Sequence, residues 1–308
     1  MAGATGAVGR PLCAQLFDAG HEVVGLTRSA EKATGLASRG VEPVVADALD
    51  ASAVAAAVAD AQPEVVVSQL TDLPADFNAA GDRAAANDRV REQGTRNLLV
   101  AARASGARRI VAQSLGFAYR PGGTGLATED EPLYADGPSP LDATVRSLEV
   151  MESEVLGVQE LGGVVLRYGF FYGPGSWYGK GGSAVHDLRR RRLPKVGAGE
   201  GVWSFCHVDD AASACVTAVE GTATGTFNIC DDHPAAVAEW LPTLAHAAGA
   251  PPPLRAPALV ARLVAGRYPA YLMTEVRGAA NDRAKRELGW SPRWPDWRDG
   301  FREGLAPE

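Results

Sequence analysis

Short apolar runs alternate with longer mixed segments through the first half of the chain. The candidate strands are residues 22–27, 42–46, 64–70, 109–113 and 163–167. The segments between them are long enough for helices: residues 11–19, 31–39, 51–59, 87–105 and 141–156. Because buried strands that alternate with helices form parallel sheets covered on both faces, the pattern predicts an α/β fold, a Rossmann-like doubly wound parallel sheet.

The alternation stops after Tyr172-Gly173-Pro174-Gly175, where Gly and Pro become frequent. One more strand–helix unit follows at residues 202–219, with a further strand at 226–229. We therefore expect residues 1–168, with 202–230 returning to them, to form the sheet domain, and residues 169–201 and 231–308 to form a smaller C-terminal substrate-binding lobe. The long connection 119–140 is rich in Gly, Pro and acidic residues, and loops of this length are often functional.

Composition narrows the class of protein. A formal net charge of −7 over 308 residues argues against a nucleic-acid partner, and the basic run 189–192 is explained as the solvated end of a helix. No apolar run approaches the roughly 20 residues that span a bilayer, so we expect no membrane partner and a cytoplasmic protein. The four cysteines lack C-x-x-C spacing and are predicted to be buried, reduced thiols, and we expect no metal.

The start of the chain carries the most informative motif, Gly3-Ala4-Thr5-Gly6-Ala7-Val8-Gly9. Glycines at this spacing allow a tight turn, a close approach of backbone to a pyrophosphate, and close packing of the following helix. The first amides of that helix then face the phosphates. Such a turn follows a strand, but only Met1 and Ala2 precede it. We expect either an unusually short central strand or native residues upstream of Met1.

The end of the second strand predicts which dinucleotide binds. An acidic residue there hydrogen-bonds the ribose 2′-hydroxyl of NAD, whereas an Arg accommodates the 2′-phosphate of NADP. Here the chain has Thr27-Arg28-Ser29, with a guanidinium and no carboxylate, so we predict NADPH. Asp47 and Ala48 follow the third strand, where the adenine is expected; Asp47 is equally explained as a turn or N-cap residue.

Several motifs in order along the chain resemble the extended short-chain dehydrogenase/reductase superfamily, in its NAD-dependent epimerase/dehydratase branch. They are the glycine turn, Asn87 with Gly94-Thr95-x-Asn97-Leu98-Leu99, Ser114, Leu166-Arg167 with Tyr172-Gly173-Pro174-Gly175, His207-Val208-Asp209-Asp210, and Lys285-Arg286-Glu287-Leu288-Gly289-Trp290. The resemblance extends the expected cofactor contacts from Gly3, Thr5, Gly6, Ala7, Val8, Gly9, Arg28, Ser29, Asp47 and Ala48 to Leu70, Asn87 and Tyr168.

One part of the family pattern is missing. Members of the family carry a catalytic Tyr and, four residues later, a Lys that lowers the tyrosine pKa. Alignment places Thr144 and Leu148 at these positions, and none of the four lysines follows a tyrosine by four residues. An aliphatic hydroxyl is a much weaker acid than a phenol, so Thr144 does not replace the tyrosine. Ser114 is expected to orient a substrate oxygen, although a satisfied strand-end serine is the alternative.

The family positions that bind a sugar diphosphate are also altered. Phe170 stands where the family commonly has Asn, and Trp203 where it commonly has Arg. Aromatic side chains at these places favour an aromatic ligand over a diphosphate, although core packing explains any one of them. The expected substrate contacts are Tyr119, Thr144, Phe170, Trp177, Tyr178 and Trp203.

The resulting functional hypothesis is an NADPH-dependent ketoreductase acting on a polycyclic aromatic, polyketide-derived substrate. A phenol or enol of the substrate beside the carbonyl would supply the stabilising hydrogen bond, as implied by the resemblance to atypical, simocyclinone-type angucyclinone ketoreductases. The alternatives are a nucleotide-sugar epimerase/dehydratase and a non-catalytic NADP-binding regulatory protein. The helices at 87–105 and 141–156 often build a dimer interface in this family, so a homodimer is compatible with the sequence.

Overall fold

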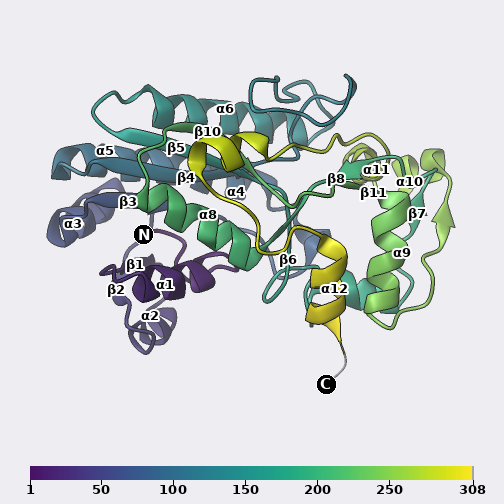
Figure 1. The fold of residues 1–308 in the computed structure, drawn as a ribbon, viewed down its shortest axis with the longest axis horizontal. Helices are drawn as coiled ribbons and strands as arrows, with labels where there is room; N and C mark the ends of the chain where they lie inside the picture. Colours follow the sequence, from purple (N-terminus) through teal and green to yellow (C-terminus); the bar gives the residue numbers. More distant parts are fainter. Residues whose placement is uncertain (307–308) are drawn as a thin grey trace.

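A parallel sheet forms the centre of the computed structural model, which describes residues 1–306. Its strands are β1 (Val24–Thr27), β2 (Glu42–Val45), β3 (Val65–Ser68), β4 (Arg109–Leu115), β5 (Gly162–Tyr168) and β10 (Gly225–Ile229). Strand β2 pairs with β1, and β3, β4, β5 and β10 pair in that order, all in parallel (Figure 1). This arrangement confirms the predicted Rossmann-like α/β fold.

A single residue joins the two halves of this sheet. Ala2 bridges Leu26 of β1 and Ser68 of β3, and its amide donates to the Val67 carbonyl oxygen at 2.8 Å. The chain then turns sharply at Gly3, whose φ is +83°. A Cβ atom added to Gly3 would lie 2.2 Å from the Gln69 carbonyl oxygen. Only glycine therefore allows the turn to approach the end of β3 this closely.

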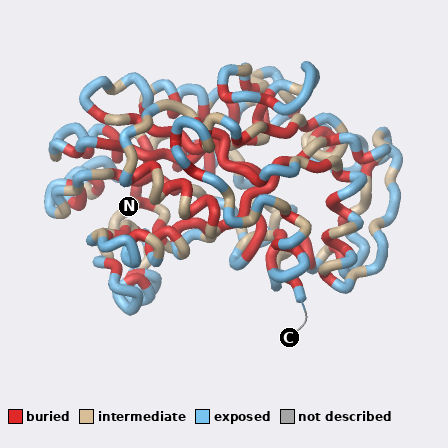
Figure 2. The backbone as a smooth tube through the Cα atoms, in the orientation of Figure 1, coloured by how far each residue is buried: buried red, intermediate tan, exposed pale blue. Residues whose placement is uncertain are grey.

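Helices cover both faces of the sheet. Helices α1 (Gly9–Asp18) and α8 (Val208–Glu220) pack together on one face, and α3 (Ala51–Ala61), α5 (Thr95–Ser105) and α6 (Leu141–Gly157) lie on the other (Figure 1). Helix α2 (Ala30–Ala37) connects β1 and β2. Alternate side chains of β4 enter different cores: Val111 joins the core that includes α1 and α8, and Ile110 joins the core that includes α3 and α5. Burial is concentrated in these layers (Figure 2).

The segment predicted as one long helix at 87–105 has three parts. Helix α4 (Ala84–Arg89) leads into a π-helical turn, η2 (Val90–Gly94), and α5 continues from it. A π-helical turn changes which side chains share a face, and such turns occur frequently at functional sites.

Most of the rest of the chain forms a lobe of short strand pairs and helices, at the right of Figure 1. Strand β6 (Phe170–Tyr172) pairs with β9 (Phe205–His207), β7 (Lys195–Val196) with β12 (Arg255–Ala256), and β8 (Val202–Trp203) with β11 (Ala235–Ala236). The helical elements of the lobe are α7 (Ser183–Arg189), α9 (Val237–Ala247), α10 (Ala258–Val264), α11 (Arg267–Thr274) and α12 (Trp297–Leu305). The turn η3 (Ala284–Leu288) packs instead on β10 and joins the core that includes α1 and α8. Aromatic side chains dominate the core of this lobe, including Trp203, Phe205, Trp240 and Trp297.

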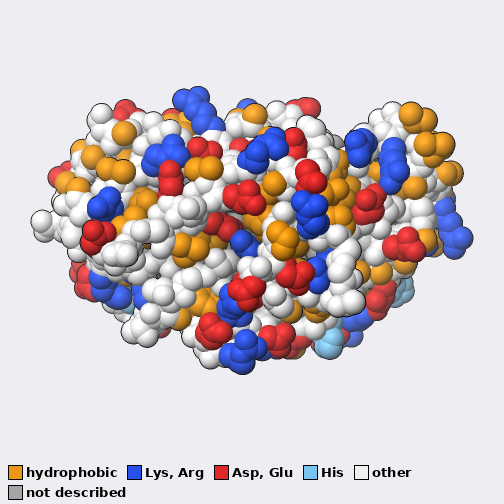
Figure 3. All heavy atoms as spheres, turned by 90° about the horizontal axis from the view of Figure 1, so that it is seen from above, with side chains coloured by type: hydrophobic (Ala, Val, Ile, Leu, Met, Phe, Trp, Pro, Cys, Tyr) orange, Lys and Arg blue, Asp and Glu red, His pale blue; other side chains and the backbone are white. Residues whose placement is uncertain are grey.

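Charges of both signs are interspersed over the face of the molecule seen in Figure 3. The four cysteines are buried free thiols, as predicted. Within residues 1–306, the helices are all too short or too polar to cross a lipid bilayer.

The turn at Gly3 gives a testable prediction with a matched control. Gly20 also has a left-handed backbone (φ +87°), but an added Cβ there would meet no atom of residues 1–306 within 4 Å. We expect Gly20→Ala to lower the free energy of unfolding by about 1–2 kcal/mol through backbone strain alone. Gly3→Ala should lower it by about 1–3 kcal/mol more, because the new methyl group overlaps the β3 backbone. Urea unfolding of both variants tests this; equal losses would contradict the close approach.

Candidate functional site between the glycine turn and the second lobe

The glycine turn forms an open cradle at the start of α1. A Cβ atom on Gly9 would lie 2.1 Å from the Gly3 carbonyl oxygen, so α1 begins directly against the turn. At Gly6 the nearest atom to an added Cβ is that same oxygen at 3.4 Å. The first amides of a helix lack intrahelical acceptors and carry partial positive charge. The predicted segment Gly3, Thr5, Gly6, Ala7, Val8 and Gly9 therefore fits a dinucleotide pyrophosphate.

A second loop meets this cradle beside a cation of α1. Gly175, in the Tyr-Gly-Pro-Gly segment, has φ +78°, and an added Cβ would lie 2.5 Å from a guanidinium nitrogen of Arg10 and 4.0 Å from Ala7. Arg10 follows the third glycine directly and is exposed. It is a candidate phosphate ligand that the sequence prediction missed, although its place after the motif was a usable signal.

At the other end of the cradle, two arginines converge on one carboxylate. Arg28 donates to Asp72 Oδ1 at 3.0 Å, and Arg83 donates to Asp72 Oδ2. Burial raises the pKa of Asp72, but the hydrogen bonds from both arginines outweigh it, and the pKa is lowered. The Asp72 amide in turn donates to Asn87 Oδ1 at 2.8 Å, while the Ser29 side chain caps α2. The Arg28 guanidinium is exposed and charged, so it is a candidate phosphate ligand, whereas the Ser29 hydroxyl is already used in capping.

The residues expected near the adenine lie close to one another. A Cβ atom on Gly94 would lie 2.7 Å from Leu70 Cδ1 and 3.3 Å from Ala48 Cβ, which places both side chains beside η2. Asp47 is exposed, and its carboxylate accepts a hydrogen bond from the Leu49 amide at 3.0 Å. The apolar side chains of Ala48 and Leu70 thus lie together against Gly94 of η2. The hydrogen bond from the Leu49 amide to Asp47 stabilises the turn that contains Ala48.

The Ser114 hydroxyl, which was predicted to orient a substrate oxygen, lies in a buried network of polar side chains. Ser114 is 1% exposed, and its hydroxyl donates to Glu152 Oε1 at 2.5 Å. Glu152 also accepts from Arg167 Nε at 3.0 Å and from another Arg167 nitrogen at 2.5 Å. Burial lowers the pKa of Arg167, but its hydrogen bonds to Glu152 outweigh this and raise it. Ser114 therefore belongs to a buried network that ties α6 to β4 and β5, and this corrects its assignment as a substrate-orienting residue.

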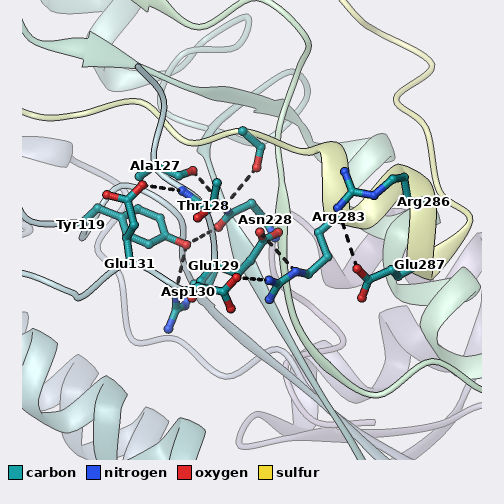
Figure 4. A network of polar contacts seen from close by, with 12 residues as sticks. Tyr119, Ala127, Thr128, Glu129, Asp130, Glu131, Asn228, Arg283, Arg286 and Glu287 are labelled. Atoms are coloured by element: carbon teal, nitrogen blue, oxygen red, sulfur yellow. Dashed lines mark hydrogen bonds and ion pairs between the residues drawn. The ribbon is translucent and has the colours of Figure 1, made fainter. Parts of the chain in front are cut away.

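Tyr119 belongs to the same network, which corrects its assignment to the substrate. Its hydroxyl donates to Asn228 Oδ1 at 2.6 Å and accepts from Arg167 at 3.0 Å, and the side chain is fully buried. Burial raises its pKa to about 12. Figure 4 shows Tyr119 beside Asn228 and the carboxylates of the long loop.

Asn228 and Arg283 hold the centre of the long loop 119–140 in place (Figure 4). Glu129 accepts a hydrogen bond from the Asn228 amide at 2.8 Å and lies 3.7 Å from Arg283 Nε. Arg283, at the start of η3, also pairs with Asp130. These contacts hold the loop against β10 and the C-terminal segment.

Tyr168 is also buried in the protein core. Its hydroxyl accepts from Gln69 Nε2 at 3.1 Å and donates to the Ala211 carbonyl oxygen at 3.3 Å, and the residue is 1% exposed. Burial raises its pKa well above the usual value. The predicted cofactor contact of Tyr168 is therefore corrected to a packing role.

Most of the aromatic residues predicted to line a cleft pack against one another instead. Phe170 stacks between Trp203, at a centroid distance of 3.6 Å, and the half-buried Phe117, at 4.1 Å. Tyr178 meets Trp203 edge-on at 5.8 Å and is buried. Phe170, Trp203 and Tyr178 thus form lobe core, which corrects the predicted aromatic cleft. Trp177 differs, because it is half-buried and its Nε1 donates to the Pro74 carbonyl oxygen at 3.0 Å.

Thr144 faces a pair of buried charges on α4 and η2. Its hydroxyl donates to Asp88 Oδ2 at 2.8 Å, and Asp88 Oδ1 lies 3.9 Å from an Arg91 nitrogen. Burial raises the pKa of Tyr268, on α11 of the second lobe, to about 12; the charge of Arg91 lowers it and that of Asp88 raises it. Asp88 and Arg91 were not among the residues predicted from the sequence.

Comparison with known proteins identifies the family. A model of the NAD dependent epimerase/dehydratase family matches residues 1–230. The chain belongs to this family. A relative from a Streptomyces species, named 3-diazoavenalumate denitrifying reductase, is 47% identical over 302 residues, covering 98% of this chain and 98% of the relative. Together these matches identify an NAD(P)-dependent oxidoreductase.

Solved structures of other family members show the same fold. UDP-glucose 4-epimerase from Thermotoga maritima, determined with UDP-glucose, superposes with a TM-score of 0.79 at 20% identity, covering 99% of this chain and 96% of that one. A human epimerase family protein determined with NADPH gives a TM-score of 0.77 at 20% identity, covering 99% and 97%. The matched family is NAD dependent, which supports a nicotinamide cofactor here; a UDP-glucose 4-epimerase from Thermus thermophilus was determined with NAD, and the human protein with NADPH.

This family member departs from the pattern at the reaction centre. Thr144 and Leu148 lie on α6 where the family's Tyr and Lys are expected, and Leu148 is 1% exposed. The nearby charges come instead from Asp88 and Arg91, on a different helix. The site therefore lacks a phenol activated by a lysine.

The Glu152–Arg167 pair predicts a large effect on stability. Glu152→Gln removes the charge that Arg167 needs inside the core, and breaking a buried pair from one side costs about 3–5 kcal/mol. Glu149→Gln is the matched control, because Glu149 is exposed on the same helix. Urea unfolding of the two variants measures the difference. A loss for Glu152→Gln no larger than that for Glu149→Gln would show that the ion pair does not hold α6.

Proposed function

We propose that this protein is an NADPH-dependent reductase that replaces the diazo group of an aromatic compound by hydrogen and releases N2. The observation that carries the proposal is the loss of the family's Tyr and Lys in a chain whose cofactor turn is complete. A relative named as a denitrifying reductase of a diazo compound, 47% identical over nearly the whole chain, supports it.

The chemistry explains why the acid/base pair is dispensable. Reduction of a carbonyl leaves an alkoxide that must gain a proton, which the Tyr–Lys pair supplies. An aryl diazonium ion is already cationic, and the balanced reaction is Ar–N2⁺ + NADPH → Ar–H + N2 + NADP⁺. The bound nicotinamide would supply the hydride. No oxyanion forms, so no protein acid is required. A lysine at position 148 would instead repel a cationic substrate.

An aromatic substrate follows from the stability of diazo compounds. Aliphatic diazonium ions lose N2 spontaneously, whereas conjugation with an aromatic ring preserves the group until an enzyme acts. The half-buried Phe117 and Trp177 provide aromatic surface beside the packed core of the second lobe. Aromatic rings stack favourably on such side chains.

NADPH is favoured by the paired arginines. The Arg28 and Arg83 side chains are 56% and 52% exposed, and both donate to Asp72. A 2′-phosphate offers the same kind of acceptor with more charge, and guanidinium groups bind phosphate through paired hydrogen bonds.

The cofactor assignment gives a direct prediction. We expect Arg28→Ala to raise the KM for NADPH by about tenfold or more, because a charge-assisted hydrogen bond to the phosphate is worth about 1.5–3 kcal/mol. The KM for NADH should stay nearly unchanged. Arg39→Ala, at an exposed arginine just after α2, is the control. Equal changes for NADPH and NADH would contradict the assignment.

The reaction itself is tested by trapping the released gas. An aryl diazonium salt that carries an ortho hydroxyl and ¹⁵N in both positions is incubated with the protein and NADPH. We expect one molecule of ¹⁵N2 for each NADPH oxidised, with the arene as the second product. NADPH oxidation without N2, or no oxidation at all, would overturn the proposed reaction.

A second candidate is the ketoreductase predicted from the sequence, with the carbonyl beside a phenol of a polycyclic aromatic substrate. The absence of the Tyr–Lys pair also fits a substrate that stabilises its own oxyanion. This candidate is weakened because Phe170, Trp203 and Tyr178 pack into the core instead of lining a wide cleft. A panel of ortho-hydroxyaryl ketones in the same NADPH assay distinguishes the two reactions.

A further inference from the structure

Asp88 and Arg91 are opposite charges that are buried together without completing each other's hydrogen bonds. Asp88 is 8% exposed and Arg91 is 5% exposed. Their closest recorded approach is 3.9 Å, which is too long for a hydrogen bond. Within residues 1–306, Asp88 Oδ1 and Arg91 Nε both lack a hydrogen-bond partner.

Such an arrangement is unfavourable unless something else completes it. A buried polar group without a partner is strongly destabilising, and more so when it is charged. Here one unsatisfied acceptor and one unsatisfied donor lie on neighbouring side chains. Arg91 Nε needs a hydrogen-bond acceptor, and Asp88 Oδ1 needs a donor or a positive charge. A ligand that carries an acceptor next to a cationic group supplies both.

The place of the pair in the fold points to the substrate. The π-helical turn η2 begins directly after α4, so Asp88 at the end of α4 and Arg91 in η2 meet in one site. Thr144, at the position of the family's catalytic tyrosine, holds Asp88 Oδ2. The charges of Asp88 and Arg91 both act on the pKa of Tyr268, which belongs to α11 of the second lobe.

We infer that Asp88 and Arg91 are the substrate-recognition pair for an ortho-hydroxyaryl diazonium ion, with Arg91 Nε donating to the phenolate oxygen and Asp88 Oδ1 facing the cationic nitrogen. This inference rests on the proposed function and deepens it. Thr144 keeps the second oxygen of Asp88 in place.

The ligand's own chemistry fits both contacts. An ortho-hydroxyaryl diazonium ion loses its phenolic proton readily and becomes a zwitterion with adjacent opposite charges. In that form the phenolate donates electron density to the diazo group and makes it a poorer hydride acceptor. A hydrogen bond from a guanidinium holds electron density on the oxygen. Arg91 would therefore restore the electrophilic character of the group that is reduced.

The directions in which burial shifts the pKa values of Asp88 and Arg91 also favour a zwitterionic ligand. Burial raises the pKa of Asp88, although the hydrogen bond from Thr144 and the charge of Arg91 act in the opposite direction. Burial likewise lowers the pKa of Arg91. A zwitterion that supplies one opposite charge to each side chain stabilises the ionised form of both.

Turnover of two substrates tests the assignment of Arg91. We compare kcat/KM for an ortho-hydroxyaryl diazonium salt and for the same salt without the hydroxyl. In Arg91→Gln the ratio of the two values should fall about tenfold, the loss of one charge-assisted hydrogen bond. In Asp88→Asn both values should fall together. The controls are Arg89→Gln and Asp82→Asn, two exposed residues of the same region.

A binding experiment tests the pair even if the diazo reaction is not observed. The probe is 2-(aminomethyl)phenol, a stable molecule with an ammonium group next to a phenol, and benzylamine is the comparison without the phenol. With NADP⁺ bound, we expect the wild-type protein to bind the probe about tenfold more tightly than benzylamine. Arg91→Gln should lose this preference, and Asp88→Asn should weaken both ligands. NADP⁺ affinity, measured in parallel, shows that the variants are folded.

The outcomes separate the two proposals. If no N2 is released but the binding preference is present and lost in Arg91→Gln, the proposed reaction fails and the recognition pair stands. If N2 is released but the substrate ratio and the binding preference are unchanged in Arg91→Gln, the recognition pair is overturned. No preference for the probe in the wild-type protein overturns it as well.

Discussion

The buried Glu152–Arg167 ion pair is the contact on which the candidate site depends. It joins α6 to β5, and Glu152 also accepts a hydrogen bond from Ser114 of β4. Arg167 donates in addition to the Tyr119 hydroxyl and to the Glu129 carbonyl oxygen, both in the long loop 119–140. Thr144 lies eight residues before Glu152 on α6 and so near the same face. The pair therefore fixes the helix in the orientation that sets Thr144 against Asp88. Losing it would disturb the fold and the site together.

The chemistry follows from what the fold keeps and what it has lost. The glycine turn, the α1 N-terminus and the arginines around Asp72 keep the means to hold a charged dinucleotide. The position of the family's proton donor has become Thr144, beside an apolar Leu148. A hydride acceptor that is already cationic does not need that donor, and it benefits from a nearby carboxylate. In the proposed reaction, charge is thus neutralised instead of created on oxygen.

Much of the fold was predictable from the sequence, because apolar runs and glycine spacing are local signals. The strands at β1 to β5, the glycine turn and the missing Tyr–Lys pair were all visible there. The aromatic cleft was not predicted correctly, since a sequence does not show that Phe170 and Trp203 fill each other's space. Ser114 was misassigned because its partner Glu152 is distant in the chain. Asp88 and Arg91 have the i,i+3 spacing of an ordinary ion pair on a helix, and a π-helical turn has no simple sequence period.

The central claim is that this site selects a cationic diazo group over a carbonyl. The most direct measurement is a competition in which an ortho-hydroxyaryl diazonium salt and the corresponding ortho-hydroxyaryl ketone, at equal concentration, compete for limiting NADPH. The account predicts that the arene from the diazonium salt exceeds the alcohol from the ketone by at least about 100-fold, since only the diazonium ion meets both buried charges. Preferential formation of the alcohol would contradict it.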